Sequence, residues 1–396
     1  MSDTIIGVGK SNLGNADQAA KEASQIAIEK LKGKKALFAL IFATAGYDQE
    51  QLMQGFSTIL GNIPMSGCSG EGIITPSGSD ESSCIVAVML FAGTQLPIYN
   101  FIASGLKENS YQCGEALAEA VNKYHTNGKE TLMIFLDSMT ANVTKVLEAL
   151  EKKLAWNPLI IGGTAGDMMK FQKTYQYHNG KVYTDTITAV MLPSDYKVDW
   201  LVSHGCEEVG LEQKVTKTDK NAIVEIDNQP AWETFRQFLP DNPETFKGED
   251  AFHLCLGEIK QCETPYGEQL IIRMPVGMDK TTGAVKFSVE IPRGCPIHLT
   301  RRDPEVIAEN VLAAFKNLLA RNQNKKVLAV FQYDCAGRGK VIYGHNVNNL
   351  LIKPVQQLLP ADTPWIGFHT YGEIAPIGNK IFFHNFTAVI AVLFDK

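Results

Sequence analysis

Internal repetition is the feature that most constrains the fold, because one short layout occurs three times along the chain. Each copy has a proline, an apolar step into glycine, a second glycine near an acidic residue, a turn-rich gap and a β-branched run. The copies begin with Pro64–Gly72, Pro158–Asp167 and Pro364–Glu373, and end in the apolar runs Cys84–Phe91, Thr188–Leu192 and Thr387–Phe394. Such repetition indicates a fold assembled from equivalent supersecondary units.

The segments upstream of the three glycine turns also repeat. An apolar, strand-like run comes first in each copy: Leu37–Thr44, Leu132–Asp137 and Val327–Tyr333. A helical pattern follows it: Gln51–Leu60, Val143–Leu154 and Asn349–Leu359. Alternating strands and helices predict an α/β fold of layered sheets built from strand–helix–strand units. Because the strands are apolar throughout, we expect helices on both faces of the sheets.

Two further helices and a separate block of strands complete the predicted elements. Helices are predicted over Asp17–Lys32 and over Pro304–Leu319, the second with Asp303 as its N-cap. The strands Gln269–Met274, Ala284–Ile291 and Ile297–Arg301 alternate more, as in a sheet with one wet face. The polar stretch Thr216–Asn221 predicts a two-part chain, with domains at residues 1–218 and 219–396.

Composition excludes several classes of protein. The 396 residues carry a net charge of -6 and no basic block, so we expect no nucleic-acid binding. The N-terminus lacks the layout of a signal peptide, and the longest apolar runs are shorter than the ~18 residues of a membrane span. None of the eight cysteines forms a C-x-x-C pair. We therefore expect reduced thiols, a cytoplasmic location and no membrane contact.

Two familiar motifs are absent. The segment Gly7–Ser11 resembles the end of a P-loop, but position 4 is threonine where that motif needs glycine. A turn leading into the first helix is the better interpretation. The eight histidines show no H-x-x-x-H or H-E-x-x-H spacing, so a preorganised zinc site is not expected.

The segment Asp334–Gly339 follows a strand directly and brings a thiol and a guanidinium to its end. Arg338 can bind a carboxylate or phosphate through its planar fork, or it can pair with Asp334 or Glu373 to hold the turn. Cys335 would act as a nucleophile only if His369 or another histidine lay beside it. We expect no enzymatic activity, and a cysteine-dependent enzyme remains the less favoured alternative.

His369, Tyr371 and Glu373 alternate along one extended stretch. With the period of a strand, their side chains would share one face. Burying such a set without partners would be costly, so we expect a binding role. We predict that this face and the turn at Cys335 and Arg338 lie opposite each other across a shared hollow.

These residues carry a resemblance to the FIST family. The stretch Val202–Phe235 resembles the end of a FIST N-terminal domain, and Pro64–Gly72 and Ile161–Asp167 resemble its glycine turns. The C-terminal half resembles the FIST C-terminal domain through Gly283–Leu299, Arg302-Asp303, Phe331–Gly339, Gly367–Pro376 and His384–Phe394. On this resemblance, Cys335, Arg338, Tyr371 and Glu373 would line a ligand pocket in that domain.

The resemblance implies a sensory protein that binds a small ligand and signals through a partner such as a histidine kinase of a two-component system. Members of this length also resemble nitric-oxide-sensing haemoproteins that bind haem b. His204, His369 and His384 are the candidate axial ligands, of which only one is expected. The alternatives are a sensor of an amino acid or other small metabolite, gripped by Arg338 and Glu373, and a scaffolding protein. A homodimer is compatible with either kind of sensor.

Overall fold

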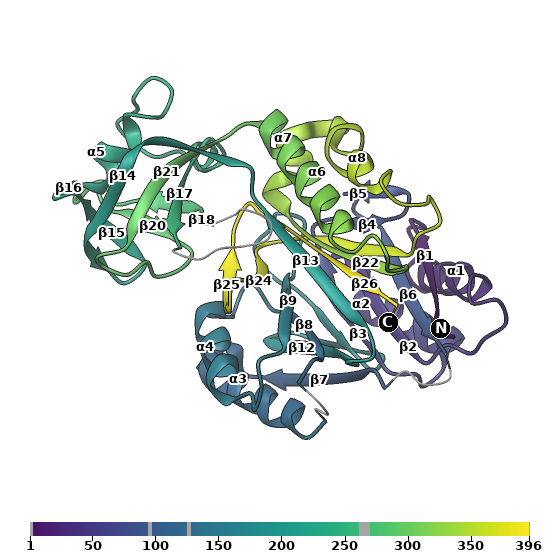
Figure 1. Cartoon of the computed structure of the whole chain (residues 1–396). Helices are drawn as coiled ribbons and strands as arrows, with labels where there is room; N and C mark the ends of the chain where they lie inside the picture. Colours follow the sequence, from purple (N-terminus) through teal and green to yellow (C-terminus); the bar gives the residue numbers. More distant parts are fainter. Residues whose placement is uncertain (1–2, 94–96, 125–127, 261–269, 396) are drawn as a thin grey trace.

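The computed structural model describes residues 3–93, 97–124, 128–260 and 270–395. In this part of the chain, three copies of one α/β unit lie around a common centre. A small β-rich domain, residues 206–302, projects from the third copy at the upper left of Figure 1. Cys262 and Gln269, which belong to the predictions above, lie outside the described residues.

Each unit runs strand, helix, strand, helix, glycine-rich strand, hairpin, strand. The first unit comprises β1 (Ile5–Ser11), α1 (Ala16–Glu29), β2 (Phe38–Thr44), α2 (Gln49–Leu60), β3 (Met65–Gly70), β4 (Ile73–Thr75), β5 (Gly78–Asp80) and β6 (Val86–Ala92). The second comprises β7 (Tyr99–Ser104), α3 (Leu106–Asn122), β8 (Thr131–Leu136), α4 (Val143–Lys153), β9 (Leu159–Thr164), β10 (Gln176–His178), β11 (Lys181–Tyr183) and β12 (Thr186–Leu192).

The third unit has the same order, but the small domain is inserted after its first strand. It comprises β13 (Lys197–Ser203), α6 (Pro304–Ala320), β22 (Val327–Cys335), α7 (Lys340–Tyr343), α8 (Lys353–Gln356), β23 (Trp365–Thr370), β24 (Glu373–Ile377), β25 (Lys380–His384) and β26 (Ala388–Phe394). Asp303 caps α6 as predicted, because its carboxylate accepts the N–H of Glu305 and of Val306.

The three units interlock through their hairpins. The sheets have the orders β1-β6-β2-β3-β10-β11, β7-β12-β8-β9-β24-β25 and β13-β26-β22-β23-β4-β5. Each sheet therefore has four strands of one unit and the hairpin of another. Because the exchange is cyclic, no unit completes its own sheet.

The glycine turns meet at the centre and bond to one another. The amide of Glu71 donates to the carbonyl of His369 over 2.9 Å, and that of Gly166 to Ser69 over 3.0 Å. The amide of Tyr371 donates to Thr164 over 3.2 Å and completes the ring. Three segments far apart in sequence are thereby brought together.

Glycine is required in two of the strands that lead to this ring, β3 and β9. Gly67 and Gly162 have φ of 150° and 147°. A Cβ at Gly162 would lie 2.0 Å from the carbonyl oxygen of Ile134 on the neighbouring strand, and one at Gly67 would lie 1.7 Å from that of Ile41. Any side chain would therefore clash with the parallel strand beside it.

The inner faces of the three sheets pack on each other. Phe42 and Phe135 lie 5.2 Å apart between ring centroids, and Phe135 and Tyr333 lie 5.9 Å apart. The outer faces are covered by α1 and α2, by α3 and α4, and by α6 with the helical segment before β23. The predicted α/β class is confirmed, but each sheet has helices on one face and the other two sheets on the second.

The small domain is an antiparallel sheet with one short helix and a 3₁₀ turn. It comprises β14 (Cys206–Asp219), β15 (Ala222–Ile226), β16 (Gln229–Pro230), α5 (Ala231–Arg236), a 3₁₀ turn (Gly248–Phe252), β17 (Leu254–Ile259), β18 (Leu270–Arg273), β19 (Pro275–Met278), β20 (Val285–Phe287) and β21 (Pro296–Arg302). The domain division that we expected after residue 218 falls inside β14. In space, the chain leaves the core after residue 205 and returns at residue 303.

Two local predictions need correction. Residues 7–11, expected to form a turn, lie in the buried strand β1. Gly9 is essential there, since a Cβ would lie 1.9 Å from the carbonyl oxygen of Ala23 in α1. The helix expected over Asn349–Leu359 is a π-helical turn, Asn348–Ile352, followed by the short α8.

None of the described helices combines the length and the apolar character that crossing a bilayer requires.

Candidate functional site

Arg338 is fully buried and bonds to the protein itself. Its Nε donates to Asp334 Oδ1 over 2.8 Å, and its Nη1 donates to the carbonyls of Ser203 and His204 over 3.2 and 3.0 Å. Those carbonyls belong to the linker between β13 and the small domain. The guanidinium therefore fixes the linker to the end of β22, which was the structural alternative in the sequence analysis.

Cys335 and Glu373 are also buried. Burial raises the pKa of the Cys335 thiol, and the Glu373 carboxylate raises it further, so the reactive thiolate is disfavoured. Glu373 accepts hydrogen bonds from the Thr370 hydroxyl and, over 3.2 Å, from the Thr387 amide. Burial raises the pKa of Glu373 well above its ordinary value. Neither side chain lines the cavity of about 680 Å³ between the core and the small domain.

The three histidines are buried at separate places. His204 Nδ1 accepts the amide N–H of Cys206 over 2.9 Å, and His369 Nε2 lies 2.7 Å from the hydroxyl of Ser79. His384 Nε2 lies 3.0 Å from the carbonyl oxygen of Ala375, and burial lowers its pKa to about 3. A haem needs open space beside the ligating nitrogen, and none of these rings lines the cavity described below. These three histidines therefore offer no open position for a haem iron in this conformation.

The expected common face of His369, Tyr371 and Glu373 does not form. His369 is the last residue but one of β23 in one sheet, whereas Glu373 begins β24 in another. The chain bends between them at Tyr371 and changes sheet, so strand alternation is interrupted. The shared hollow is also missing, because the two segments are paired neighbours with Cys335 opposite Thr370. Of the predicted residues, Tyr371 alone lines the cavity described below.

Tyr371 joins two carboxyl groups from the other units. Its hydroxyl lies 2.8 Å from Asp167 Oδ1 and 2.9 Å from Glu71 Oε2, and it accepts the amide N–H of Met169 over 2.7 Å. The single phenol proton can be donated fully to only one of the two carboxyl groups.

The pKa directions distinguish the two carboxyl groups. Burial raises the pKa of Glu71. Burial would also raise that of Asp167, but hydrogen bonds from the amides of Gln172 and Lys173 lower it overall. Asp167 is therefore the stronger acid of the two, and Glu71 is the carboxyl group that binds a proton more readily.

The loop after Asp167 is strained and tightly held. Met168, Met169 and Phe171 have φ of 66°, 54° and 51°, which costs non-glycine residues roughly 1 kcal/mol or more each. The Asp167 carboxylate accepts the amides of residues 171, 172 and 173 over 2.6–2.9 Å. Phe171 stacks on Tyr371 with 4.8 Å between ring centroids, yet remains 57% exposed. Strain of this kind is typical of functional sites.

A cavity of about 680 Å³ lies beside this loop, between the core and the small domain. We call it the interdomain cavity. Its volume is within the usual range for small-molecule sites, ~300–1,000 Å³. The core contributes residues 138–145, Thr164, Phe171, Tyr371 and Phe383, and the small domain contributes Lys220, Asn221, Met274, Val276, Ser288, Val289 and Glu290.

The position of the interdomain cavity follows from the sheet topology. The parallel strands β8 and β9 end beside it, and α4 begins there, as at ligand sites of other α/β sheets. The hydroxyls of Ser138 and Thr140 are inaccessible to solvent and have no hydrogen-bond partner among the described residues. A polar ligand group that enters beside them would satisfy them. The amide of Lys145 in the first turn of α4 is already bonded to the N-cap residue Asn142.

Sequence reasoning missed most of these residues. Ser138, Thr140 and Phe171 belong to no motif, and the small-domain residues lie more than 75 positions further along the chain than Ser138. A usable signal was the junction between the predicted strand Leu132–Asp137 and the helix after it, because strand ends in α/β sheets line ligand crevices.

The fold and the cavity define an α/β protein with a potential ligand site between two parts of one chain. Family models match over most of the sequence, the FIST N domain at residues 37–229 and the FIST C domain at residues 231–376. The chain therefore belongs to the FIST family, whose domains are generally sensory.

Two relatives with similar sequences are both uncharacterised proteins. One from Mycobacterium tuberculosis is 23% identical over 98% of this chain and 100% of its own length. One from Methanocaldococcus jannaschii is 24% identical over 51% of this chain and 41% of its own. Among solved structures, phosphoribosylformylglycinamidine synthase II of Thermotoga maritima shows 10% identity and a TM-score of 0.25, over 100% of this chain and 73% of that one. That similarity is too low to support an inference.

Proposed function

We propose that this protein is a sensor that binds a small metabolite in the interdomain cavity and passes the binding event to a signalling partner, such as a histidine kinase. The observation that carries the proposal is that the core and the small domain both wall the cavity. A ligand that contacts both parts stabilises one relative position of the two.

The connection between the two parts suits such a movement. The chain crosses at His204–Gly205 and again at Arg302–Asp303. Gly205 has φ of 65°, and a Cβ there would lie 2.6 Å from Ile307 Cα, so this crossing requires glycine. Arg302 donates to the carbonyl of Gly337 over 2.8 Å, and its guanidinium lies 3.8 Å from the Phe386 ring centroid. Both crossings lie together at the base of the small domain, so a movement of that domain would turn about them.

The walls favour a ligand with a polar end and an apolar or flat body. The hydroxyls of Ser138 and Thr140 lie near the start of α4, where partial positive charge favours an anionic group. Phe171 and Met274 offer apolar surface for the remainder. An amino acid or a similar small carboxylate fits this pattern. Such a ligand would be held by these residues, since Arg338 and Glu373 are engaged inside the core.

The other parts of the proposal come from the sequence and from the family resemblance. A cytoplasmic location, the kinase partner and the lack of enzymatic activity are predictions that we retain. Haem b with nitric oxide also remains a prediction, and the proposal of a ligand in the interdomain cavity does not depend on it. A Soret band after addition of hemin that shifts with nitric oxide would establish it, and protein that stays colourless would exclude it.

A thermal-shift screen of amino acids and small carboxylates tests the cavity. A ligand at about 100 times its Kd stabilises the folded state by about 2.7 kcal/mol, which raises Tm by several degrees. Val276→Trp should fill the cavity from the small domain and abolish the shift. Leu211→Trp is the matched control, because Leu211 is 85% exposed in the same domain and does not line the cavity. Equal shifts in both variants would place the ligand elsewhere.

A further inference from the structure

The three units differ at one equivalent position of the inserted hairpins. It lies two residues after the last hairpin residue whose strand pair occurs in all three sheets. That position holds Asn179 in the sheet of the first unit, Pro376 in that of the second and Pro76 in that of the third. The strand register establishes the equivalence, with the pairs Tyr177↔Gly67, Ile374↔Gly162 and Ile74↔Gly367.

In the first unit, Asn179 bonds to the backbone of Met65 in β3. Its amide donates to the carbonyl of Met65 over 2.9 Å, and its side-chain oxygen accepts the Met65 N–H over 3.2 Å. Asn100 Nδ2 donates to the same Met65 carbonyl and to Asn179 Oδ1, both over 2.8 Å. The outward-facing backbone of β3 is thus satisfied by amide groups of the chain.

Proline cannot reproduce this arrangement, because it has no N–H. The inserted hairpin pairs with three residues of β3, but with only two residues of β9 and two of β23. The carbonyl of Ile160, the counterpart of Met65, receives no N–H from position 376. Cavities of about 810 Å³ and 710 Å³ lie beside Pro376 and Pro76.

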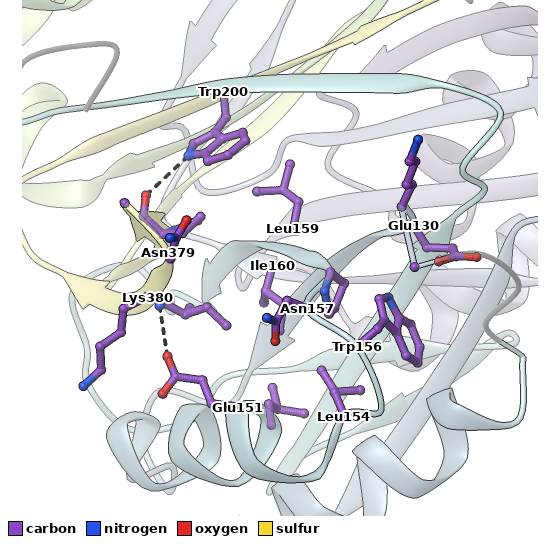
Figure 2. Close-up of a pocket in the computed structure, with 17 residues that line it drawn as sticks. Glu130, Glu151, Leu154, Trp156, Asn157, Leu159, Ile160, Trp200, Asn379 and Lys380 are labelled. Atoms are coloured by element: carbon purple, nitrogen blue, oxygen red, sulfur yellow. Dashed lines mark hydrogen bonds between the residues drawn. The ribbon is translucent and has the colours of Figure 1, made fainter. Parts of the chain in front are cut away.

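The larger cavity is a groove between two tryptophans, which we call the tryptophan groove. Figure 2 shows Trp200 and Trp156 at opposite ends, with Leu159 and Ile160 between them. Its edge is fixed by two hydrogen bonds, from Trp200 Nε1 to the Pro376 carbonyl over 3.4 Å and from the Ile381 amide to Glu151 Oε1 over 3.0 Å (Figure 2).

We propose that the tryptophan groove docks an extended peptide segment of a partner protein. The peptide backbone places an N–H opposite the Ile160 carbonyl, as Asn179 does opposite Met65, and an apolar side chain or proline packs between the two indoles. Short strand addition and aromatic-lined grooves are established modes of peptide recognition. The occupant is argued from the chain itself, because the first unit closes the same place with amide N–H groups, those of the Asn179 backbone and the Asn100 side chain.

This inference does not depend on the ligand of the interdomain cavity. The two sites lie at opposite ends of α4. Its first turn borders the cavity, and Leu150, Glu151 and the C-cap residue Leu154 border the groove. The groove is therefore a second site, for a partner.

A library of random linear 12-residue peptides displayed on phage, selected against the full chain, provides the probe. Selected peptides, synthesised and titrated, should change tryptophan emission. Trp156 and Trp200 are partly exposed, whereas Trp232 and Trp365 are only 4% and 2% exposed, so the signal reports on the groove. Pro376→Asn, which introduces the residue that closes the first unit, should weaken binding at least tenfold.

Pro76→Asn is the matched control and should leave peptide binding unchanged. Trp200→Ala is a second test variant, should Pro376→Asn alter the circular dichroism spectrum, and it should also weaken binding at least tenfold. Failure to enrich any peptide over an albumin control would overturn the proposal, as would equal affinity for all variants. Binding of acetamide or nicotinamide without peptide binding would overturn it too. Val276→Trp should retain peptide binding, which separates this test from that of the cavity.

Discussion

Replacing Arg338 by methionine distinguishes the structural role seen here from the ligand-binding role that its sequence context predicted. The substitution removes the partner of Asp334 and the donors to the carbonyls of Ser203 and His204. The uncompensated carboxylate would lie in the core, where Asp334 is completely buried. Loss of one partner of a buried pair costs about 3–5 kcal/mol. We therefore expect a strongly destabilised protein.

The double variant Asp334→Asn/Arg338→Met supplies the control. Asparagine removes the buried charge but can still accept the hydrogen bond of Gln332, so at least half of the lost stability should return. Urea denaturation of the ligand-free variants, followed by far-ultraviolet circular dichroism, measures both effects. If Arg338→Met were as stable as the wild type within about 1 kcal/mol but lost the ligand-induced thermal shift, Arg338 would be a ligand residue and our reasoning would be refuted.

Three further substitutions test other parts of the account. Gly162→Ala should lower the free energy of unfolding by about 3 kcal/mol or more, since its Cβ would lie 2.0 Å from a carbonyl oxygen of β8. Gly277→Ala is the control, because its Cβ meets open space and should change Tm little. Equal Tm values for the two variants would contradict this expectation. Burial lowers the pKa of His384 to about 3, and the unfolded chain titrates near 6.5. The unfolded state therefore binds the proton first, and stability should fall as pH falls from about 6.5 towards 3, by up to about 1.4 kcal/mol per unit; His384→Gln should lessen that slope, and an unchanged slope would contradict the assignment. Tyr371→Phe should cost about 1–2 kcal/mol and speed tryptic cleavage after Lys170, because the loop loses its hydroxyl anchor; an unchanged cleavage rate would show that the hydroxyl does not hold the loop.

The repeat was predictable from the sequence because each unit carries its own apolar strands and obligatory glycines. The exchange of hairpins was not, since the choice of neighbouring sheet depends on contacts between segments that lie far apart. β1 was missed because Gly7 and Gly9 resemble turn residues, although they serve the close approach of α1.

The candidate site was predicted only in part. Tyr371 was predicted to line a pocket with Cys335 and Glu373, whereas it lines a different cavity without them. The error arose at the bend after Thr370, where the chain leaves one sheet for another and separates His369 from Glu373. No local pattern reports such a change of sheet. The wall contributed by Val276 and Ser288 depends on how the small domain lies against the core, which is a property of the whole fold.

Hydrogen–deuterium exchange with and without the ligand found in the thermal-shift screen tests the central claim most directly. A ligand in the interdomain cavity should slow exchange at once in residues 138–145, in residues 168–173 and in residues 274–290 of the small domain. Protection confined to the surroundings of Cys335 and His384, with those three segments unchanged, would contradict it.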